Sequence, residues 1–228
     1  MAGSTKRLTV TDWGLIGYKE ALCRQIQLVD ERLGELSEDS LILVEHYPVV
    51  TIGRSGGHDD LIVPEDVLRH NGIELYQADR GGKATFHEPG QLVVYSITKL
   101  ENNDVRLYIR TLLEAAAAVL RAYGLNPEFK DGRPGLWVQS QKIVCVGVSV
   151  KKGVTYHGIA INVNNDLKGY KWIVPCGHSG EVFTSIMKEC GGFVAMSEVK
   201  RAVIKEFKRC FHYGDSSWGL IRIRYQEE

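Results

Sequence analysis

The sequence lacks an excess of charge of either sign, because its 28 lysine and arginine residues are matched by 28 aspartate and glutamate residues. Proteins that bind nucleic acid usually carry a basic excess, so we expect no nucleic acid partner. No apolar run approaches the roughly 20 residues that cross a bilayer, so we expect no membrane partner. The opening MAGSTKR is followed neither by an apolar core nor by an arginine-rich stretch, which favours a cytoplasmic protein.

Cysteine is present, but without the pattern of a disulfide framework or a zinc site. The five cysteines are odd in number, widely spaced and without a C-x-x-C pair, so reduced thiols are expected. A reduced cysteine is by default a small buried apolar side chain, and Cys23 and Cys145 lie among periodic apolar residues. Cys176 differs because it lies between Pro175 and Gly177, outside any apolar pattern. Cys176 is therefore the candidate for a reactive thiol.

The composition that is present is that of an ordinary globular protein, with 44% hydrophobic and 25% charged residues. A chain of this length can bury a sizeable core, so we expect residues 1–228 to form a single domain. Helical and strand patterns mix without the regular alternation of βαβ units. This predicts an α+β fold with a mixed, largely antiparallel β-sheet and flanking helices.

Apolar spacing locates the expected elements. Helices are expected over residues 18–33, 64–68, 105–123, 183–189 and 197–211, with Pro64 at a first helical position and Gly124 ending the longest helix. Strands are expected over residues 41–45, 49–52, 73–76, 91–97, 142–150, 154–163 and 220–225. The strands over 142–150 and 154–163 are expected to form a hairpin, and residues 53–60 a surface loop.

Three segments combine glycines with reactive side chains: residues 80–91, residues 142–147 with 156–158, and residues 175–177. Such loops can converge at one edge of a sheet in a small domain. Gly81 and Gly82 would let the backbone approach a ligand closely, although a plain hairpin turn between Tyr76 and Phe86 is the alternative. Neither glycine-rich phosphate-binding motif occurs, and Pro89 interrupts any helical H-E-x-x-H zinc motif begun at His87. No metal site is expected.

A nucleophilic cysteine needs a histidine or a cation that favours the thiolate. Lys142 begins an otherwise apolar strand, where an ammonium is costly unless it is paired or lies at the strand end. It is either the partner of a thiolate or an exposed strand end. His157 and Asn162 lie on a predicted strand and are either part of a site or hydrogen-bonded groups of the core.

Five motifs follow one another along the chain: RGGxxTxHxPGQL at 80–92, GxWV at 135–138, KIxxxGV at 142–148, HGxAxN at 157–162 and VPCG at 174–177. Together they resemble the octanoyltransferases of lipoate biosynthesis, the lipoyl(octanoyl) transferase family. The resemblance implies a biotin/lipoate protein ligase-like fold and a single catalytic domain. It also implies transfer of octanoyl from octanoyl-acyl carrier protein to a lysine of the lipoyl domains of 2-oxoacid dehydrogenase and glycine cleavage proteins. The thioester is already activated, so no cofactor is expected.

Carried onto the matching positions, the resemblance implies that Cys176 forms the acyl thioester and that Lys142 lowers the pKa of its thiol. The substrate pocket would consist of three groups: Arg80, Gly81, Gly82, Lys83, Ala84, Thr85, Phe86 and His87; Cys145, Val146 and Gly147; and His157, Gly158, Ile159 and Ala160. Backbone N–H groups at Gly177 and Gly147 would stabilise the oxyanion. His87 and His157 would shape the pocket or relay protons.

The chain departs from the family pattern at two places: Glu88 replaces the usual glycine, and Val182 and Phe183 replace the usual Gly-Val pair. The first departure bears on the local backbone and on the polarity of the pocket rim. Two basic segments could meet the partner proteins, which are usually acidic, or could be solvated faces. They are Lys151 with Lys152, and Lys200, Arg201, Lys205, Lys208 and Arg209.

Three other functions compete with octanoyl transfer. An ATP-dependent lipoate or biotin protein ligase would use the glycine loop to hold an acyl-adenylate, and Cys176 would be incidental. A lipoyl amidotransferase would move the acyl group between two protein lysines through the same cysteine and lysine. An acyl-binding or scaffold protein of the same fold would not need Cys176.

Overall fold

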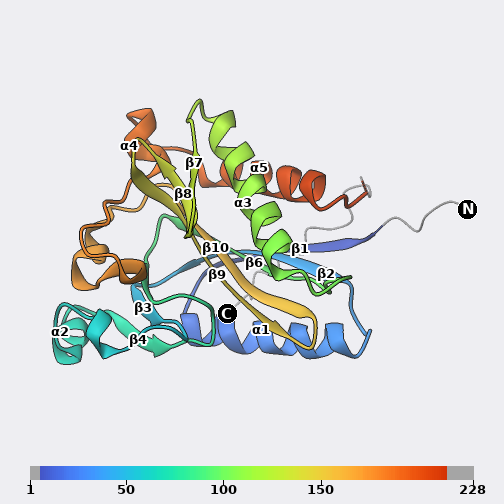
Figure 1. Cartoon of the computed structure of the whole chain (residues 1–228), viewed down its shortest axis with the longest axis horizontal. Coiled ribbons are helices and arrows are strands. Elements are labelled where there is room, and N and C mark those ends of the chain that lie inside the picture. The colour runs from blue at the N-terminus through green and yellow to red at the C-terminus, as the bar shows by residue number, and fades with distance from the viewer. Residues whose placement is uncertain (1–5, 215–228) are drawn as a thin grey trace, which may run out of the picture.

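Two β-sheets organise the chain, which a computed structural model describes over residues 6–214 (Figure 1). The larger sheet has seven strands, in the order β1 (Leu8–Ile16), β2 (Asp39–His46), β6 (Gln91–Ile97), β10 (Val154–Asn162), β9 (Gln141–Lys151), β8 (Arg133–Val138) and β7 (Glu128–Lys130). Only β1 and β2 pair in parallel, and the remaining neighbours are antiparallel. The predicted mixed, largely antiparallel sheet is confirmed.

The smaller sheet has three strands in the order β4 (Glu74–Gln77), β3 (Val49–Ile52) and β5 (Ala84–His87). β3 pairs in parallel with β4 and antiparallel with β5. Because β3 lies between the other two strands, a hairpin turn between Tyr76 and Phe86 is wrong. The intervening loop instead turns onto the end of β3, where the Arg54 N–H donates to the Arg80 carbonyl at 2.9 Å.

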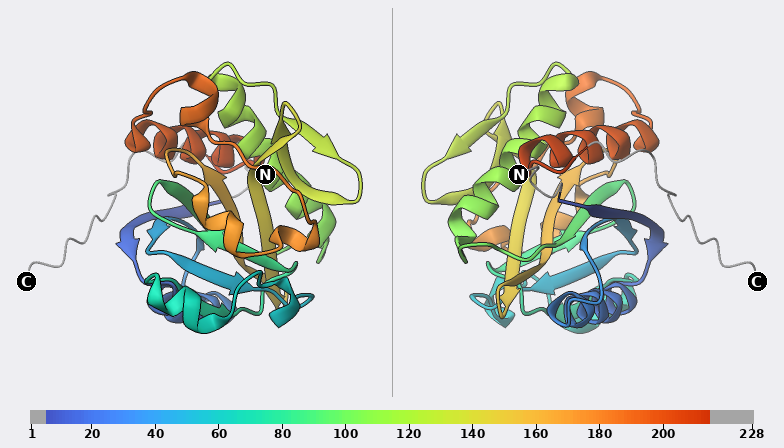
Figure 2. Two further views of the ribbon diagram at one scale, coloured as in Figure 1. Left: turned by 90° about the vertical axis from the view of Figure 1, so that its left-hand side faces the viewer. Right: turned by 90° about the vertical axis from the view of Figure 1, so that its right-hand side faces the viewer.

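Helices cover both faces of the larger sheet (Figures 1 and 2). The helices are α1 (Tyr18–Leu33), α2 (Glu65–His70), α3 (Val105–Ala122), α4 (Ile186–Cys190) and α5 (Met196–Cys210), and short 3₁₀ turns span His58–Asp60, Lys168–Trp172 and Pro175–Gly177. Alternate side chains of β2 and β6 point to opposite faces. Leu43 and Val94 pack with α3 and α5, whereas Val44 and Val93 pack with α1 and the smaller sheet.

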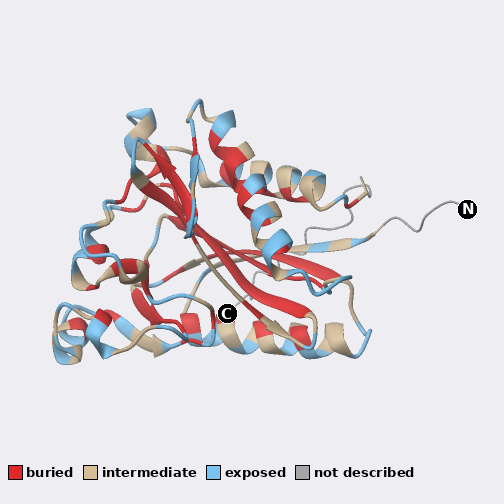
Figure 3. Cartoon of the chain, in the orientation of Figure 1, coloured by how far each residue is buried: buried red, intermediate tan, exposed pale blue. Residues whose placement is uncertain are grey.

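Burial is concentrated in β2, β6 and β10, the central strands of the larger sheet (Figure 3). Every residue of β6 and β10 is buried, which explains their near-continuous apolar and β-branched sequences. The predicted β9–β10 hairpin is confirmed, with Lys151 opposite Val154 at its tip. The loops of the candidate site are attached to these buried strands.

Several expectations from the sequence differ from the structure. The helix expected over 183–189 begins only at Ile186, because residues 182–184 are extended alongside Lys142 and the Ser185 side chain caps the helix. Pro64 is the N-cap of α2 rather than its first residue. Strands β1, β5, β7 and β8 were not predicted, and the strand expected over 220–225 lies outside the described residues.

The default burial of the cysteines is correct only for Cys145. Cys23 and Cys190 are exposed, and Cys210 is half-buried. Cys23 lies on the solvent side of α1, so the apolar stripe of that helix does not include it. The surface loop expected over 53–60 has buried ends at Gly53 and Asp60, because the glycine-rich loop packs over it.

Candidate active site

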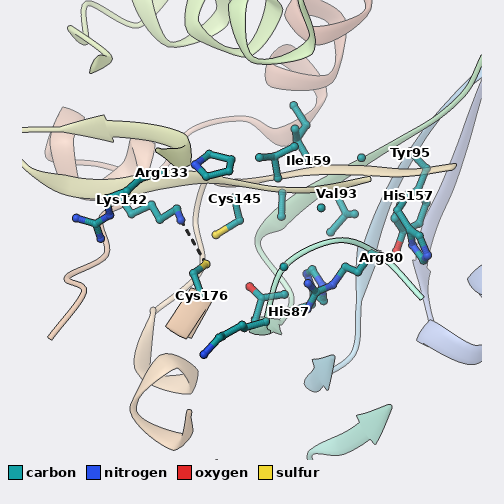
Figure 4. Close-up of a pocket in the computed structure, with 18 of the residues that line it drawn as sticks. Arg80, His87, Val93, Tyr95, Arg133, Lys142, Cys145, His157, Ile159 and Cys176 are labelled. Atoms are coloured by element: carbon teal, nitrogen blue, oxygen red, sulfur yellow. Dashed lines mark hydrogen bonds between the residues drawn. The ribbon is translucent and has the colours of Figure 1, made fainter. Parts of the chain in front are cut away.

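A cavity of about 140 Å³ lies where the smaller sheet faces β6, β9 and β10 (Figure 4). Most of the residues expected to bind substrate line it: Arg80, Gly82, Lys83, Thr85, His87, Cys145, Val146, Gly147, His157, Gly158, Ile159 and Ala160. Lys142 and Cys176 line it as well. The three distant segments singled out in the sequence therefore meet in one place.

Three residues of the expected pocket do not line the cavity, namely Gly81, Ala84 and Phe86. Ala84 and Phe86 alternate with Thr85 and His87 along β5, so their side chains point to the opposite side and pack in the core. The Gly81 N–H donates to the Val148 carbonyl at 3.0 Å, which attaches the loop to β9. These positions support the pocket rather than form its wall.

The cavity also contains residues that sequence reasoning missed: Tyr18, Val93, Tyr95, Arg133, Pro134 and His178. Val93 and Tyr95 share one face of β6, so the alternation of a strand could have indicated them once the facing surface was known. Tyr18 begins α1 far from the motifs, and no local signal marks it.

The Cys176 sulfur is presented by a 3₁₀ turn with an uncommon backbone. Cys176 has φ +55°, a left-handed backbone conformation that residues other than glycine rarely adopt. The turn is tied to the rest of the molecule because the Val174 N–H donates to the Asp60 carbonyl at 2.7 Å. Such backbone conformations persist only where the surroundings enforce them, and they concentrate at functional sites.

Lys142 is buried, with 2% of its surface exposed, so an exposed strand end is wrong. Its Nζ donates to the Cys176 Sγ at 3.3 Å (Figure 4). Its backbone is held on both sides, because its N–H donates to the Val182 carbonyl at 2.8 Å and its carbonyl accepts from Thr184 at 3.0 Å. A Cβ at Gly135 would lie 2.7 Å from the Lys142 Cε, so only glycine leaves room for the side chain.

An aromatic and acidic group lies behind the Lys142 ammonium. The Lys142 Nζ is 4.9 Å from the centre of the Trp137 ring. The fully buried indole donates from its Nε1 to the Glu181 Oε1 at 3.0 Å, and the same carboxylate pairs with Arg133. Trp137 belongs to a quoted motif, but Glu181 and Arg133 carry no sequence signal.

Electrostatics distinguish the two thiols of the cavity. The pKa of Cys176 is lowered to about 6, first by the neighbouring Cys145 thiol and then by the charge and hydrogen bond of Lys142, which together outweigh burial. The pKa of Cys145 is raised well above its usual value by the proximity of Cys176 and by burial. Cys176 is therefore the thiol that ionises first, and Cys145 is the thiol that stays protonated.

The Lys142 ammonium is balanced between two opposing effects. Burial acts to lower its pKa, whereas the charge of the Cys176 thiolate, the hydrogen bond to Cys176 and the charge of Glu181 act to raise it. The pKa of Lys142 is consequently raised, and the amine is protonated at neutral pH. The resting site is thus an ammonium–thiolate pair.

Histidine and arginine side chains form the rest of the polar wall. Burial lowers the pKa of His87 to about 3, so this ring is neutral, and its Nδ1 lies 2.7 Å from the Gln91 Oε1. The His157 Nε2 lies 2.8 Å from Asp79, and burial lowers the pKa of His157. Arg80 is buried and donates to the Thr51 carbonyl, and its approach to β9 requires glycine at 147, where a Cβ would lie 3.0 Å from the Arg80 Cδ.

Asn162 is a hydrogen-bonded group of the core and does not line the cavity. Its side chain donates to the Thr184 carbonyl at 3.0 Å and accepts from Gln91 at 2.9 Å. The expected oxyanion donor at Gly177 is already engaged, because its N–H donates to the Val174 carbonyl at 3.2 Å. The site therefore combines a thiol, a cation and a pocket wall, but the Gly177 N–H is not free to act as an oxyanion donor.

The two departures from the family pattern have structural roles outside the cavity. The Glu88 carboxylate accepts from the Asn165 side chain and from the Leu167 N–H, both at 3.1 Å, so it binds the following loop instead of altering the pocket rim. Phe183 stacks on Tyr170 with 3.6 Å between ring centres. This stacking places the segment that pairs with Lys142.

The basic segments expected to meet partner proteins are largely paired within the chain. Lys151 contacts Asp30 at 2.7 Å and Lys200 contacts Asp12 at 2.9 Å. On α5, Arg201 pairs with Glu198 and Arg209 with Glu206. Helix α5 also packs on the face of the larger sheet opposite the cavity. Solvated faces are the better interpretation of these paired residues.

Residues 6–214 contain no group of three or more histidine, cysteine, aspartate or glutamate side chains arranged to hold a metal ion. No helix within them has the length and apolar character to span a membrane.

Comparison with known proteins identifies close relatives. A model of the lipoyl protein ligase A/B catalytic domain matches residues 17–208. The octanoyltransferase of Roseiflexus sp. is 42% identical over 204 residues, which cover 87% of this chain and 85% of the relative. The octanoyltransferase of Caldanaerobacter subterraneus subsp. tengcongensis is 40% identical over 221 residues, which cover 96% of each chain.

Solved structures share the fold at lower identity. A bi-partite lipoate protein ligase from Thermoplasma acidophilum has a TM-score of 0.73 at 22% identity, covering 91% of this chain and 84% of its own. A biotin protein ligase from Aquifex aeolicus in complex with biotin and ATP has a TM-score of 0.55 at 14% identity, covering 91% and 71%. These likenesses confirm the expected biotin/lipoate protein ligase-like fold.

Proposed function

The chain belongs to the lipoyl protein ligase A/B catalytic family, among its octanoyltransferases, and from that premise we propose how it carries out the transfer. Octanoyl passes from octanoyl-acyl carrier protein to a lysine of a lipoyl domain through a thioester on Cys176. The observation that carries this proposal is the 3.3 Å contact between the Lys142 Nζ and the Cys176 Sγ in a cavity with partly apolar walls. Residues 1–228 act as one catalytic domain in this proposal.

In the first half-reaction the Cys176 thiolate attacks the octanoyl carbonyl carbon. The new carbon–sulfur bond forms as the bond to the carrier's sulfur breaks, and the Lys142 ammonium gives its proton to the departing thiolate. A pKa near 6 supports this step, because most of the Cys176 thiol is then ionised at neutral pH. An unperturbed thiol, with a pKa of about 8.5, would be only a few per cent ionised.

The second half-reaction needs a neutral lysine, and burial supplies the reason for one. Acylation removes the thiolate charge, which is one of the interactions that raise the pKa of Lys142. Burial then acts with less opposition and lowers the pKa. Lys142 can accept a proton from the acceptor amine as that amine attacks the thioester, and expulsion of the Cys176 thiolate restores the resting pair.

The test is intact-protein mass spectrometry after incubation with octanoyl-acyl carrier protein and no nucleotide, followed by peptide mapping. We expect one octanoyl group on Cys176. The Cys176→Ser variant should form no thioester, whereas the Cys23→Ser control, which alters an exposed thiol, should behave as wild type. The Lys142→Met variant should fold and lose most of its acylation at neutral pH, and full activity would remove its assigned role.

The alternative functions give different results in the same assay. A strict requirement for ATP would favour a ligase and contradict the thioester route. Faster acylation from an octanoylated lipoyl domain than from octanoyl-acyl carrier protein would favour an amidotransferase. Unchanged function in the Cys176→Ser variant would favour an acyl-binding protein.

A further inference from the structure

A groove of about 640 Å³ lies between α3 and the β7–β8 hairpin, which are neighbours in Figure 1. The mechanism does not use it. Its lining residues are Arg106, Ile109, Arg110, Leu113, Glu114, Phe129, Lys130, Asp131, Gly132, Arg133, Pro134 and Gly135. The groove is open to solvent, and we name it the α3–hairpin groove.

The α3–hairpin groove is basic around an apolar centre. Four lysine and arginine side chains line it against two acidic ones, although the whole chain is neutral. Arg106 is exposed and forms no ion pair with any residue of the described part of the chain. Phe129 is 48% exposed and lines the groove together with Ile109 and Leu113. An apolar patch with a cationic rim is the composition expected of a contact with an acidic protein.

The α3–hairpin groove shares part of its wall with the reaction cavity. Arg133 and Pro134, at the start of β8, line both. Arg133 also pairs with Glu181, which holds the Trp137 ring behind Lys142. A protein seated in this groove therefore touches residues that also border the reaction cavity.

The two protein substrates differ in how far their reacting group extends from the folded protein. The acceptor must bring its own lysine amine to the sulfur, and a lysine side chain has only four methylenes, so the acceptor must sit directly on the mouth. A carrier protein bears its acyl group on a long flexible phosphopantetheine arm, so its folded body can dock to one side. The groove lies to one side and suits the second geometry.

We propose that the α3–hairpin groove is the docking surface for the acidic body of the acyl-donor carrier protein. This inference rests on the proposed function and adds the place where the donor binds. Arg106 attracts the donor, and so does Arg110 once the donor's carboxylates compete with Glu114, with which Arg110 pairs at 3.0 Å. The shared wall at Arg133 and Pro134 directs the prosthetic arm into the cavity.

The experiment combines charge reversal with two donors. The double variant Arg106→Glu/Arg110→Glu is compared with Arg121→Glu, an exposed arginine of the same helix outside the groove. Acylation of Cys176 is measured with octanoyl-acyl carrier protein and with octanoyl-N-acetylcysteamine, an uncharged thioester without a protein body. We expect kcat/KM for the carrier-borne donor to fall by about tenfold or more in the double variant and to lose its dependence on ionic strength. The loss should be confined to that donor and absent in Arg121→Glu.

The other outcomes overturn the proposal. An equal loss with both donors, an equal loss in Arg121→Glu, or no loss at all would each exclude donor docking in this groove. A raised KM for the lipoyl domain, with an unchanged kcat/KM for octanoyl-acyl carrier protein, would assign the groove to the acceptor instead. If the wild type forms no thioester from either donor, the proposed function fails, and that result is distinct from a wild type that reacts while the double variant reacts equally well.

Discussion

The Lys142 Nζ lies 4.9 Å from the centre of the Trp137 ring and 3.3 Å from the Cys176 sulfur, so the ammonium is held between an aromatic face and a thiol. The indole is itself oriented by its hydrogen bond to Glu181. An aromatic ring attracts a desolvated cation by about 2 kcal/mol. Trp137 thus acts as a positioning residue that favours the charged form of Lys142.

Removing the aromatic face should weaken the thiolate. In Trp137→Leu the ammonium loses this attraction, so the apparent pKa of Cys176 should rise by about one unit, whereas Trp137→Phe should keep most of the effect. The pH dependence of Cys176 alkylation by iodoacetamide measures the shift. Thermal melting of both variants controls for the cavity left in the core. Equal shifts in the leucine and phenylalanine variants would contradict the role of the ring.

Cys145 should contribute to reactivity although it is not the nucleophile. Its thiol is the first cause of the lowered Cys176 pKa. A hydrogen bond to a charged group contributes about 1.5–3 kcal/mol, so Cys145→Ala should raise the apparent pKa of Cys176 by about one to two units. Cys145→Ser keeps a donor and should recover most of the shift. The same alkylation profile is the readout, and an unchanged profile in the alanine variant would exclude this donor.

Buried neutral histidines should make the protein sensitive to acid. Burial lowers the pKa of His46 to about 4 and that of His87 to about 3, from a usual value of 6.5. The unfolded chain therefore binds protons more readily than the folded one. The contribution of these two histidines to the free energy of unfolding is fully present above about pH 6.5 and is lost as the pH falls toward 3. Urea unfolding from pH 7.5 to 4.5 should show this decrease. The slope should be shallower in His87→Gln, which cannot titrate, and parallel slopes would contradict the prediction.

Glu88 should stabilise the fold without affecting the thiolate. Its carboxylate binds Asn165 and Leu167 outside the cavity. We expect Glu88→Gly to lower the free energy of unfolding by about 1–3 kcal/mol and to leave the alkylation profile of Cys176 unchanged. Glu88→Gln keeps an acceptor oxygen and should lie close to wild type. A shifted profile in the glycine variant would show that this position acts on the site after all.

The central elements could be predicted from the sequence because their patterns are long. The stripe of α3 and the alternating residues of the β9–β10 hairpin have enough length to fix their type and ends. Short strands such as β5 and β7 do not, because three or four residues carry no reliable period. Their existence depends on pairing with distant partners.

Residues of the candidate site that belong to sequence motifs could be predicted. Residues that reach the site only through tertiary packing could not. Cys176 stood out in the sequence because it lies between proline and glycine, outside any apolar pattern. The burial of Lys142 could not be read from its strand, because what covers it is a separate segment that follows the Cys176 turn. Glu181 and Tyr18 reach the site through tertiary packing alone, and Cys145 was correctly expected to be buried but not to contact the reactive sulfur.

The segment leaving the Cys176 turn runs directly into the residues whose backbone pairs with Lys142 on both sides. The Cys176 sulfur and the Lys142 amine are therefore linked through one short, hydrogen-bonded stretch of backbone. The separation between the Lys142 Nζ and the Cys176 Sγ is therefore set by one local stretch of chain, and a substitution in residues 177–184 would alter it without touching either side chain.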